Sequence, residues 1–574
     1  MMPGMATPPA VPTLARAKAL QQAGRLDEAA RLYRAILDQD TDHLEALYLA
    51  GAAALGLDRV DEGARLLERA VRQAPGVALF HYHLGLAYRL QERLEAAEAR
   101  FRAAVTLKPD YLEAHTALAW AAWSLVERSA AGSDIARWRR RVMQWRLTIA
   151  NSIQTIEAAA DADNDPDAIM ALGELYMCLS DVPRRRGCVA RLQRLRERQD
   201  RTRPGYRPGR RYFELSVTNV GEYAILDMLE KRRQLGWSTD EEILVLCHGE
   251  RIVNRAYLAY WEKYFRLLIH DGGPAEALVP PGTVALDRKY VLNLPNGEVV
   301  RKERYHNVAQ AEWEAQGRAP LLSLRDDHRA RGWAALEACG VPPDAWLVTL
   351  HVREAGYRYE SERAKHAARN ADILTYLPAI REITARGGWV IRLGHPAVKP
   401  LPELPQVIDY ARGPLKADWM DVFLIATCRF FVGTDSGPCH MPVAFGVPAV
   451  LTNVYPASAR PWSGGDLYIP KLLRSQVEER DLSFRELFDP PHYDKPVGDM
   501  LAGLKIAVLD NRPDEIREVV VEMMDRLDRR LAYGDADDAL QRRFDDLDTH
   551  DSYGVVGRVG RDFLRRHEAL VKGA

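Results

Sequence analysis

A turn between two apolar runs collects residue types that bind anions and hydroxyl groups. The stretch reads "FFVGTDSGPCHMPVAFGVPAVLTN" and contains Asp435, Ser436 and His440 close together. Gly433 and Gly437 lie on either side of Asp435 and allow the backbone to turn sharply and to approach a ligand. Such a turn predicts a phosphate site, with the carboxylate left for hydroxyl groups or loop N–H groups.

Two local details bear on how the helix after this turn begins. Asp435 or Ser436 can cap the helix, and Pro438 suits its first turn. The free N–H groups of that first turn would then bind the anion. Pro442 lacks an N–H group, so we expect the helix to start late or to bend there. An ordinary capped turn between a strand and a helix is the alternative.

The chain after Tyr212 contains the elements that would position this turn. Short apolar runs alternate there with helical patterns, which is typical of parallel sheets covered by helices on both faces. Two such series, beginning near Tyr212 and near Ala345, predict two Rossmann-like domains that face a cleft. Ligands of such sheets lie beyond the carboxyl ends of the strands. The expected strands are 212–217, 242–247, 346–352, 389–394, 406–410, 428–433 and 448–453, and "AYLAYWEKYFRLLI" after Arg255 is expected to be a helix.

A repeat precedes this region. The segments "GRLDEAARLYRAIL", "DRVDEGARLLERAV" and "ERLEAAEARFRAAV" begin at Gly24, Asp58 and Glu92, and their starts are 34 residues apart. This is the period of the tetratricopeptide (TPR) repeat. Small residues recur at Ala29, Gly63 and Ala97, and large ones at Tyr33, Leu67 and Phe101. We expect a solenoid of helix pairs whose concave face binds a protein partner, or else provides a packing or self-association surface.

The composition excludes several classes of protein. The 79 Lys and Arg residues balance 80 Asp and Glu residues, which gives no reason to expect nucleic acid as a partner. The six cysteines include no CxxC pair, which argues against a zinc site or a disulfide framework and suits a reducing compartment. No signal peptide or membrane-spanning run is recognisable, so a cytoplasmic protein is expected.

The segment from Val432 to about Thr452 resembles the signature of the heptosyltransferase-like GT-B glycosyltransferases, although Pro442 departs from it. The wider stretch from Tyr212 to about Ser475 is similar to bacterial TPR-linked glycosyltransferases. The resemblance implies a GT-B fold, in which the C-terminal domain binds the nucleotide-sugar donor and the N-terminal domain binds the acceptor. It also implies catalysis without a metal ion or a cofactor, and no Asp-x-Asp follows a predicted strand.

The site residues follow from this resemblance and from the strand ends. Glu222, in "NVGEY", matches the position of the catalytic base, and Glu354 is a second candidate. Arg353 offers a planar fork suited to a diphosphate. The donor-binding candidates are His351, Arg353, Arg363, Arg369, Thr434, Asp435, Ser436, Gly437 and His440.

The sequence therefore predicts an all-α solenoid followed by an α/β GT-B region. The expected parts are a disordered segment 1–12, TPR repeats 13–125, a helical linker 126–203, an acceptor domain 204–340 and a donor domain 341–574 that includes closing helices. The expected function is sugar transfer to a hydroxyl group of a protein recruited by the repeats, or of a cell-surface glycan. A non-catalytic scaffold and a sugar-nucleotide epimerase of the same fold are the alternatives.

Overall fold

The structure is a computed structural model of the chain. It describes residues 14–22, 25–130, 135–163, 166–178, 182–202, 205–271, 275–286, 291–296, 299–354, 367–488, 501, 505–548 and 557–573. The chain divides into two compact units, residues 1–192 and 193–574, and the division falls within a helix. The segment 1–12, expected to be disordered, lies outside the described residues. Among the described residues, no helix is long and apolar enough to cross a membrane.

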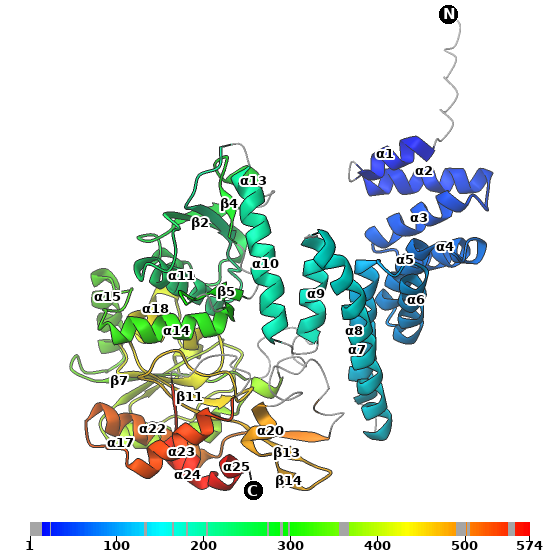
Figure 1. The fold of residues 1–574 in the computed structure, drawn as a ribbon. Helices are drawn as coiled ribbons and strands as arrows, with labels where there is room; N and C mark the ends of the chain where they lie inside the picture. The colour runs from blue at the N-terminus through cyan, green and yellow to red at the C-terminus, as the bar shows by residue number, and fades with distance from the viewer. Residues whose placement is uncertain are drawn as a thin grey trace, which may run out of the picture. The chain divides into compact units, whose positions relative to one another are not determined.

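The first unit is helical throughout its described residues, as the blue and cyan ribbons of Figure 1 show. Its helices are α1 (Leu14–Gln22), α2 (Leu26–Gln39), α3 (Leu44–Gly56), α4 (Val60–Gln73), α5 (Ala78–Leu90), α6 (Leu94–Leu107), α7 (Leu112–Ala130), α8 (Ile135–Asp163), α9 (Pro166–Cys178) and α10 (Val182–Arg201). The helices α2, α4 and α6 recur with the period of the sequence, as do α3, α5 and α7. The predicted repeats and the helical region after them are confirmed.

Small residues allow neighbouring repeat helices to touch. A Cβ atom added to Gly85 would lie 2.6 Å from the ring of Phe101, and one added to Gly63 would lie 2.8 Å from Leu55. Tyr33, Leu67 and Phe101 are fully buried and fill the remaining space. The repeat pattern is therefore a packing pattern, in which each small residue makes room for a large one.

The second unit begins with a small parallel sheet of order β3-β2-β1-β4. We call residues 205–324 the N lobe. Its strands are β1 (Arg210–Glu214), β2 (Glu242–His248), β3 (Arg266–His270) and β4 (Val284–Ala285), with a separate hairpin of β5 (Val291–Asn293) and β6 (Val299–Arg301). Its helical elements are η1 (Val220–Tyr223), α11 (Ala224–Gln234), η2 (Gly249–Arg251), α12 (Arg255–Ala259), α13 (Ala275–Leu278) and α14 (Lys302–Ala315).

The predicted helix after Arg255 is wrong in its second half. Only α12 is helical, and Arg266–His270 forms the edge strand β3, which pairs in parallel with β2. The run of leucine and isoleucine suits either element, and the open edge of β2 decides between them. The expected strand at Tyr212 is present but starts two residues earlier, at Arg210.

We call residues 326–573 the C lobe. It is built on a parallel seven-stranded sheet of order β16-β12-β11-β10-β7-β8-β9. Read from β7, the first six strands follow the Rossmann order, which reverses between β7 and β10. The strands are β7 (Leu347–His351), β8 (Trp389–Leu393), β9 (Val407–Ile408), β10 (Phe430–Thr434), β11 (Ala449–Val454), β12 (Leu467–Pro470) and β16 (Arg558–Val559).

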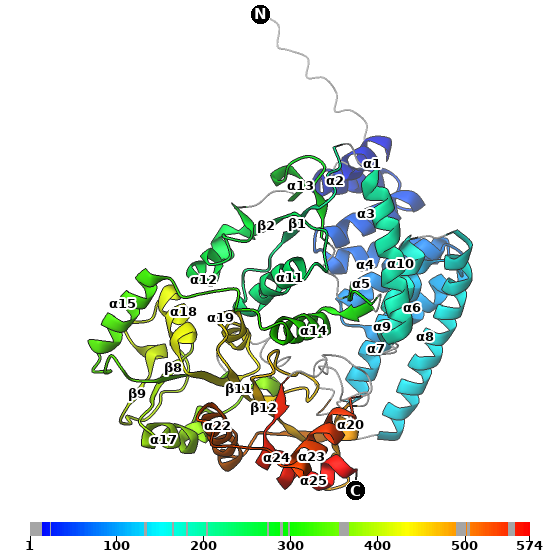
Figure 2. The same cartoon turned by 60° about the vertical axis from the view of Figure 1, so that its left-hand side comes forward.

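Helices cover both faces of this sheet, as Figures 1 and 2 show. One layer holds α15 (Asp326–Glu337) and α18 (Asp418–Thr427), and the other holds α17 (Leu377–Ala385) and α22 (Pro513–Leu527). Further elements are η3 (Ala367–Arg369), η4 (Ile373–Tyr376), η5 (Tyr410–Arg412), η6 (Gly437–His440), α19 (Pro442–Phe445), β13 (Leu472–Ser475), β14 (Arg480–Asp481), α20 (Phe484–Phe488), β15 (Ile506–Leu509), α23 (Asp535–Asp545), α24 (Arg561–Arg566) and α25 (Glu568–Lys572). Both halves of the unit are thus α/β, with helices packed on parallel sheets.

Candidate functional site

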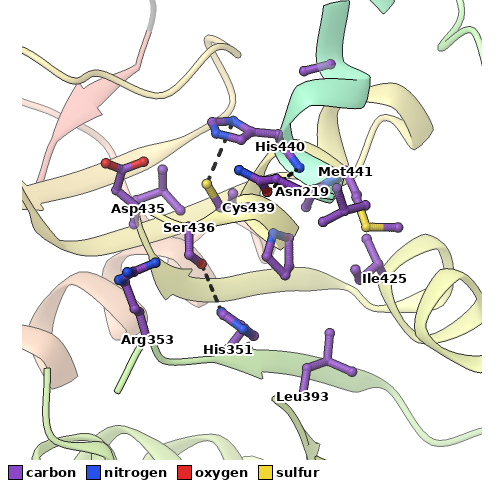
Figure 3. A pocket seen from close by; sticks show the side chains of 18 of the residues that line it. Asn219, His351, Arg353, Leu393, Ile425, Asp435, Ser436, Cys439, His440 and Met441 are labelled. Carbon is purple, nitrogen blue, oxygen red and sulfur yellow. Dashed lines mark hydrogen bonds between the residues drawn. The ribbon is translucent and has the colours of Figure 1, made fainter. Parts of the chain in front are cut away.

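A cavity of about 670 Å³ lies at the point where the strand order of the C lobe reverses. Its walls include the ends of β7 and β10 and the N-lobe turn that contains Gly221 and Glu222. Figure 3 shows side chains from these elements converging on one space. The predicted residues that line the cavity are Glu222, His351, Arg353, Glu354, Arg369, Asp435, Ser436, Gly437 and His440.

Two glycine turns meet at one wall of the cavity. A Cβ atom on Gly437 would lie 2.5 Å from Asn219 Oδ1, and one on Gly221 would lie 3.0 Å from both Gly437 Cα and His440 Cδ2. Asn219 Oδ1 also accepts a hydrogen bond from the N–H group of Gly221 at 3.0 Å. Neither turn has room for a side chain, so the two lobes approach each other through backbone atoms at this point.

The hydroxyl of Ser436 does not cap the next helix, contrary to the prediction. It lies 3.0 Å from His351 Nδ1 and donates to the carbonyl oxygen of Thr434 at 3.2 Å. The element that follows, η6, is a four-residue 3₁₀ helix, and α19 begins anew at Pro442. The expected late helix start at Pro442 is confirmed, but η6 is too short to provide the predicted anion site at a helix end.

His351 ends β7 at the floor of the cavity. Burial, together with the positive charges of Lys416, Arg392 and Arg353, lowers the pKa of His351 to about 3. The imidazole is therefore neutral at pH 7 and acts as a hydrogen-bond partner of Ser436. It fixes the start of the turn after β10 and carries no charge toward a ligand.

Two arginines belong to the same wall. Arg369 donates to the backbone oxygen of Asp435 at 2.6 Å, and its Nε lies 3.1 Å from Asp435 Oδ2. Arg353 is attached to the turn through its backbone N–H, which donates to Thr434 Oγ1 at 2.9 Å, and its Nε donates to Asn370 Oδ1. Thr434 is fully buried and supports Arg353 from below. Arg363 lies outside the described residues.

The two candidate bases have different surroundings. Glu354 accepts a hydrogen bond from Arg392 Nη2 at 2.5 Å, and Arg392 is fully buried. Burial raises the pKa of Glu354, and Arg392 opposes this shift. Glu222 is half-buried in η1, next to the glycine that touches His440. The geometry therefore gives Glu354 a partner inside the C lobe and places Glu222 on the N-lobe side of the cavity.

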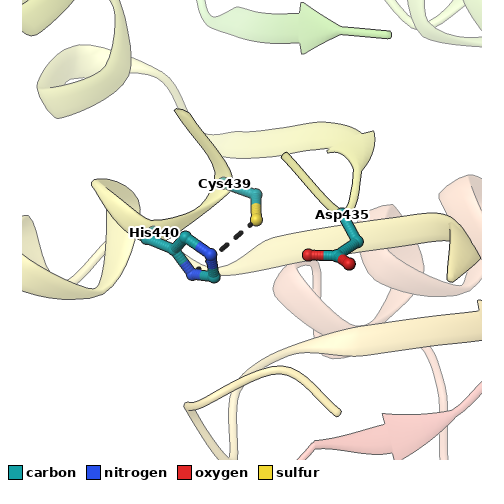
Figure 4. A group of neighbouring side chains, drawn as sticks. All are labelled: Asp435, Cys439 and His440. Atoms are coloured by element: carbon teal, nitrogen blue, oxygen red, sulfur yellow. Dashed lines mark hydrogen bonds between the residues drawn. The ribbon is translucent and has the colours of Figure 1, made fainter. Parts of the chain in front are cut away.

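Asp435, Cys439 and His440 form a group that could hold a metal ion (Figure 4). Their ligand atoms lie within 4.8 Å of one another, and Cys439 Sγ is 3.8 Å from His440 Nδ1. Two features oppose such a role. Burial raises the pKa of the Cys439 thiol, which disfavours the thiolate that binds metals, and Arg369 already neutralises Asp435. The residues therefore fit a metal ion poorly.

Several cavity residues carry no motif in the sequence. Trp462 lies against His440, and Asp466 accepts hydrogen bonds from the N–H groups of Ala449 and Ser463 at 2.7 and 3.2 Å. Burial raises the pKa of Asp466 to about 7. His306 comes from the N lobe. These residues are distant in the sequence, and no spacing rule could have joined them.

Comparisons with known proteins identify the first unit. A family model described as tetratricopeptide repeat matches residues 14–78 and 48–111. No curated protein matches the chain. Two similar solved structures are a crystal structure of MamA (16% identity, 34% of this chain, 96% of that chain, TM-score 0.26) and YrrB, "a TPR protein with an unusual peptide-binding site" (18%, 33%, 87%, 0.24).

A third similar structure is the first TPR of Spaghetti (RPAP3) bound to an HSP90 peptide, with 20% identity over 19% of this chain and 88% of that chain and a TM-score of 0.19. The family match agrees with the 34-residue period and with the observed helix pairs. The N-terminal part of the chain, over residues 14–111, is an array of tetratricopeptide repeats.

Proposed function

We propose that residues 193–574 form a glycosyltransferase that moves a sugar from a nucleotide-sugar donor to a hydroxyl group without a metal ion. One observation carries this proposal. The cavity lies at the reversal point of a Rossmann-ordered sheet and extends to the segments that follow β1 and β2 of a second parallel sheet, and the Asp435–His440 turn lines it. Ligands of open α/β sheets bind at this location. The resemblance of the turn to the GT-B donor signature gives the class of ligand.

The proposed reaction assigns a role to each side of the cavity. Glu222 accepts the proton of the acceptor hydroxyl as its oxygen bonds to the anomeric carbon of the sugar. The bond between that carbon and the phosphate oxygen breaks, and the nucleoside diphosphate leaves with the bonding electrons. Arg353 stabilises the departing charge, and the turn from Asp435 to His440 positions the donor. We assign the base to Glu222 because it lies on the N-lobe side of the cavity, where the resemblance to GT-B enzymes implies that the acceptor binds.

A panel of sugar nucleotides tests this proposal by thermal shift. A donor at about a hundredfold its Kd stabilises the folded state by about 2.7 kcal/mol. Transfer or slow hydrolysis of the donor that binds, unchanged by EDTA, is the expected result. Binding without turnover would favour a non-catalytic scaffold. Conversion of the sugar nucleotide without an acceptor would favour an epimerase, and the absence of any stabilisation would refute the assignment of a donor site.

The repeats suggest that the acceptor is a protein, because TPR arrays present surfaces for protein partners. Aromatic rings on α3 and α5 and at Tyr111, just before α7, form a ladder. The ring centroids are 5.4 Å apart for Tyr48 and His83, 5.3 Å for His83 and Tyr82, and 5.1 Å for Tyr82 and Tyr111. Trp120 on α7 is 37% exposed. Replacing Tyr82 and Trp120 by serine in the full chain should abolish labelling of a protein acceptor and preserve donor hydrolysis. Unchanged protein labelling would favour a glycan acceptor.

A further inference from the structure

Three rings stack in a line beside the candidate donor turn. The indole of Trp462 lies between two imidazoles, with centroids 4.1 Å from His440 at an interplanar angle of 18° and 4.0 Å from His306 at 27°. All three residues line the cavity. Because both faces of the indole are covered, Trp462 offers no face to a substrate. Its contacts point instead to a role through His440.

The three rings come from different parts of the second unit. His440 belongs to the turn after β10, Trp462 to the loop between β11 and β12, and His306 to α14 of the N lobe. The same helix holds the loop at a second point, since Glu314 accepts hydrogen bonds from Ser463 Oγ at 2.7 Å and from the N–H group of Gly464 at 3.1 Å. His306 and Glu314 lie about two helical turns apart on one face of α14. The N lobe therefore contacts the loop that carries Trp462 at two points.

Buried charges fix the far end of the stack. Asp227 Oδ2 lies 3.3 Å from His306 Nε2 and 2.6 Å from Lys231 Nζ. Asp227 and Lys231 are each 1% exposed, and His306 is 3% exposed. Burial would raise the pKa of Asp227, but Lys231 and His306 hold it below its ordinary value. Burying such a pair costs more desolvation free energy than an apolar pair of the same size. The Asp227–Lys231 pair lies directly behind His306 and orients the ring of that histidine.

We propose that Trp462 is a positioning residue of the donor site, which holds the His440 imidazole against the donor turn and links its position to α14 of the N lobe. The proposal rests on the proposed function in naming a donor. The stack itself is independent of it. A flat ring at position 462 is required, because it must cover His440 on one face and His306 on the other.

Two readouts in the full chain test this. The first is the ¹³C–¹H spectrum of protein labelled at histidine Cε1, in which protons over the indole face are shifted upfield. The second is thermal stabilisation by UDP, GDP, ADP and CDP. We expect Trp462→Leu to remove the upfield shift of the His440 resonance. The affinity for the nucleoside diphosphate that stabilises the wild type most should fall by about fivefold to tenfold. Trp462→Phe should restore most of both signals.

Trp419→Leu is the matched control. Trp419 also lies beside a histidine, His328, with ring centroids 5.8 Å apart, but it does not belong to the described lining of the cavity. It should leave the His440 resonance and nucleotide stabilisation unchanged. Should Trp462→Leu fail to fold, His306→Leu uncovers the outer face of the indole, and a smaller displacement of the His440 resonance is expected.

Two results would overturn the proposal. One is a His440 resonance that stays in place in the folded Trp462→Leu protein. The other is a displaced His440 resonance with wild-type nucleotide stabilisation. If none of the four nucleoside diphosphates stabilises the wild type, the proposed function fails. The spectrum then decides alone whether Trp462 positions His440.

Discussion

The two units of the chain bury different kinds of side chain. In the described part of the repeat unit, the buried polar residues are His81, His115, Thr148 and Ser152, and none of them is an acid, a lysine or an arginine. In the second unit, buried charged residues are frequent. They are Asp227, Glu230, Lys231, Asp240, Arg392, Arg460, Asp466, Lys471, Glu515, Glu522 and Asp537.

This difference separates the residues that packing of a fold requires from the residues that a binding site requires. Stacked helix pairs require only small and large apolar residues in register, as Gly85 and Phe101 show. A buried charge adds little net stability, because desolvation offsets the attraction between the partners. Charges buried around one cavity are therefore better explained by the ligand and by the geometry of the site than by folding. Asp466 lines the cavity described above, and Arg392 bonds Glu354, which also lines it.

The largest expected effect concerns Arg392, which bonds Glu354 and contacts Asp409 at 3.2 Å. Arg392→Met should destabilise the second unit by about 3 kcal/mol, because the partly buried carboxylates of Glu354 and Asp409 lose a fully buried cation. Urea unfolding followed by hydrogen exchange in β7 and β8 measures this, with repeat peptides as an internal reference. Arg386→Met removes the half-exposed partner of Asp525 and should cost about 1 kcal/mol or less. Equal losses in both variants would show that the burial of Arg392 does not determine the size of the loss.

The second effect concerns the proposed base. Glu222→Gln should lower donor turnover by about 10²–10⁴-fold and leave nucleotide stabilisation unchanged, because the amide cannot accept the proton. Glu250→Gln, at an exposed position of η2, is the control and should behave as the wild type. Wild-type turnover in Glu222→Gln would mean that another residue of the cavity acts as the base.

The third effect is a pH dependence that Asp466 gives to the second unit. The folded protein holds a proton at Asp466 up to about pH 7, whereas the unfolded chain releases it near pH 4. Asp466 therefore favours folding least above pH 7, and its contribution falls as the pH rises from about 4 to 7. The Tm of the wild type minus that of Asp466→Asn should fall by several degrees across this window. A flat difference would mean that Asp466 is ionised when buried.

The smallest effect is expected on the repeat surface. Trp120→Ser should change the free energy of unfolding by about 0.5 kcal/mol or less, since Trp120 is partly exposed. Leu67→Ala, at a fully buried position of the same unit, should cost about 2–5 kcal/mol. Thermal unfolding of both variants measures the difference. A loss in Trp120→Ser as large as that in Leu67→Ala would show that Trp120 serves packing and not partner binding.

Local patterns explain which parts of the structure the sequence could predict. The 34-residue period determines the repeat helices, and the apolar runs that end in Gly433 and Asn453 correspond to β10 and β11. The turn between them was predicted as a site from its residue types alone. The cavity does contain its side chains.

Contacts between distant segments explain what the sequence could not predict. β3 is a strand because β2 has an open edge, which the local pattern of leucines does not encode. Ser436 bonds His351 across two strands and so cannot cap its own helix. The stack of His306 on Trp462 joins the two lobes, and neither segment has a sequence pattern that predicts this contact. A single sequence contains no signal for such pairs.

The contact of Gly221 with Gly437 has a consequence for redesigning the cavity. One wall of the cavity is closed by backbone against backbone, and any side chain introduced there would collide with the opposite turn. New specificity cannot be built on that wall by substitution. The variable positions of an engineered library belong elsewhere in the lining of the cavity, at Leu393, His395, Pro396, Val398 and Ile425. The glycine wall would then stay constant while the altered side chains change which ligand the cavity accepts.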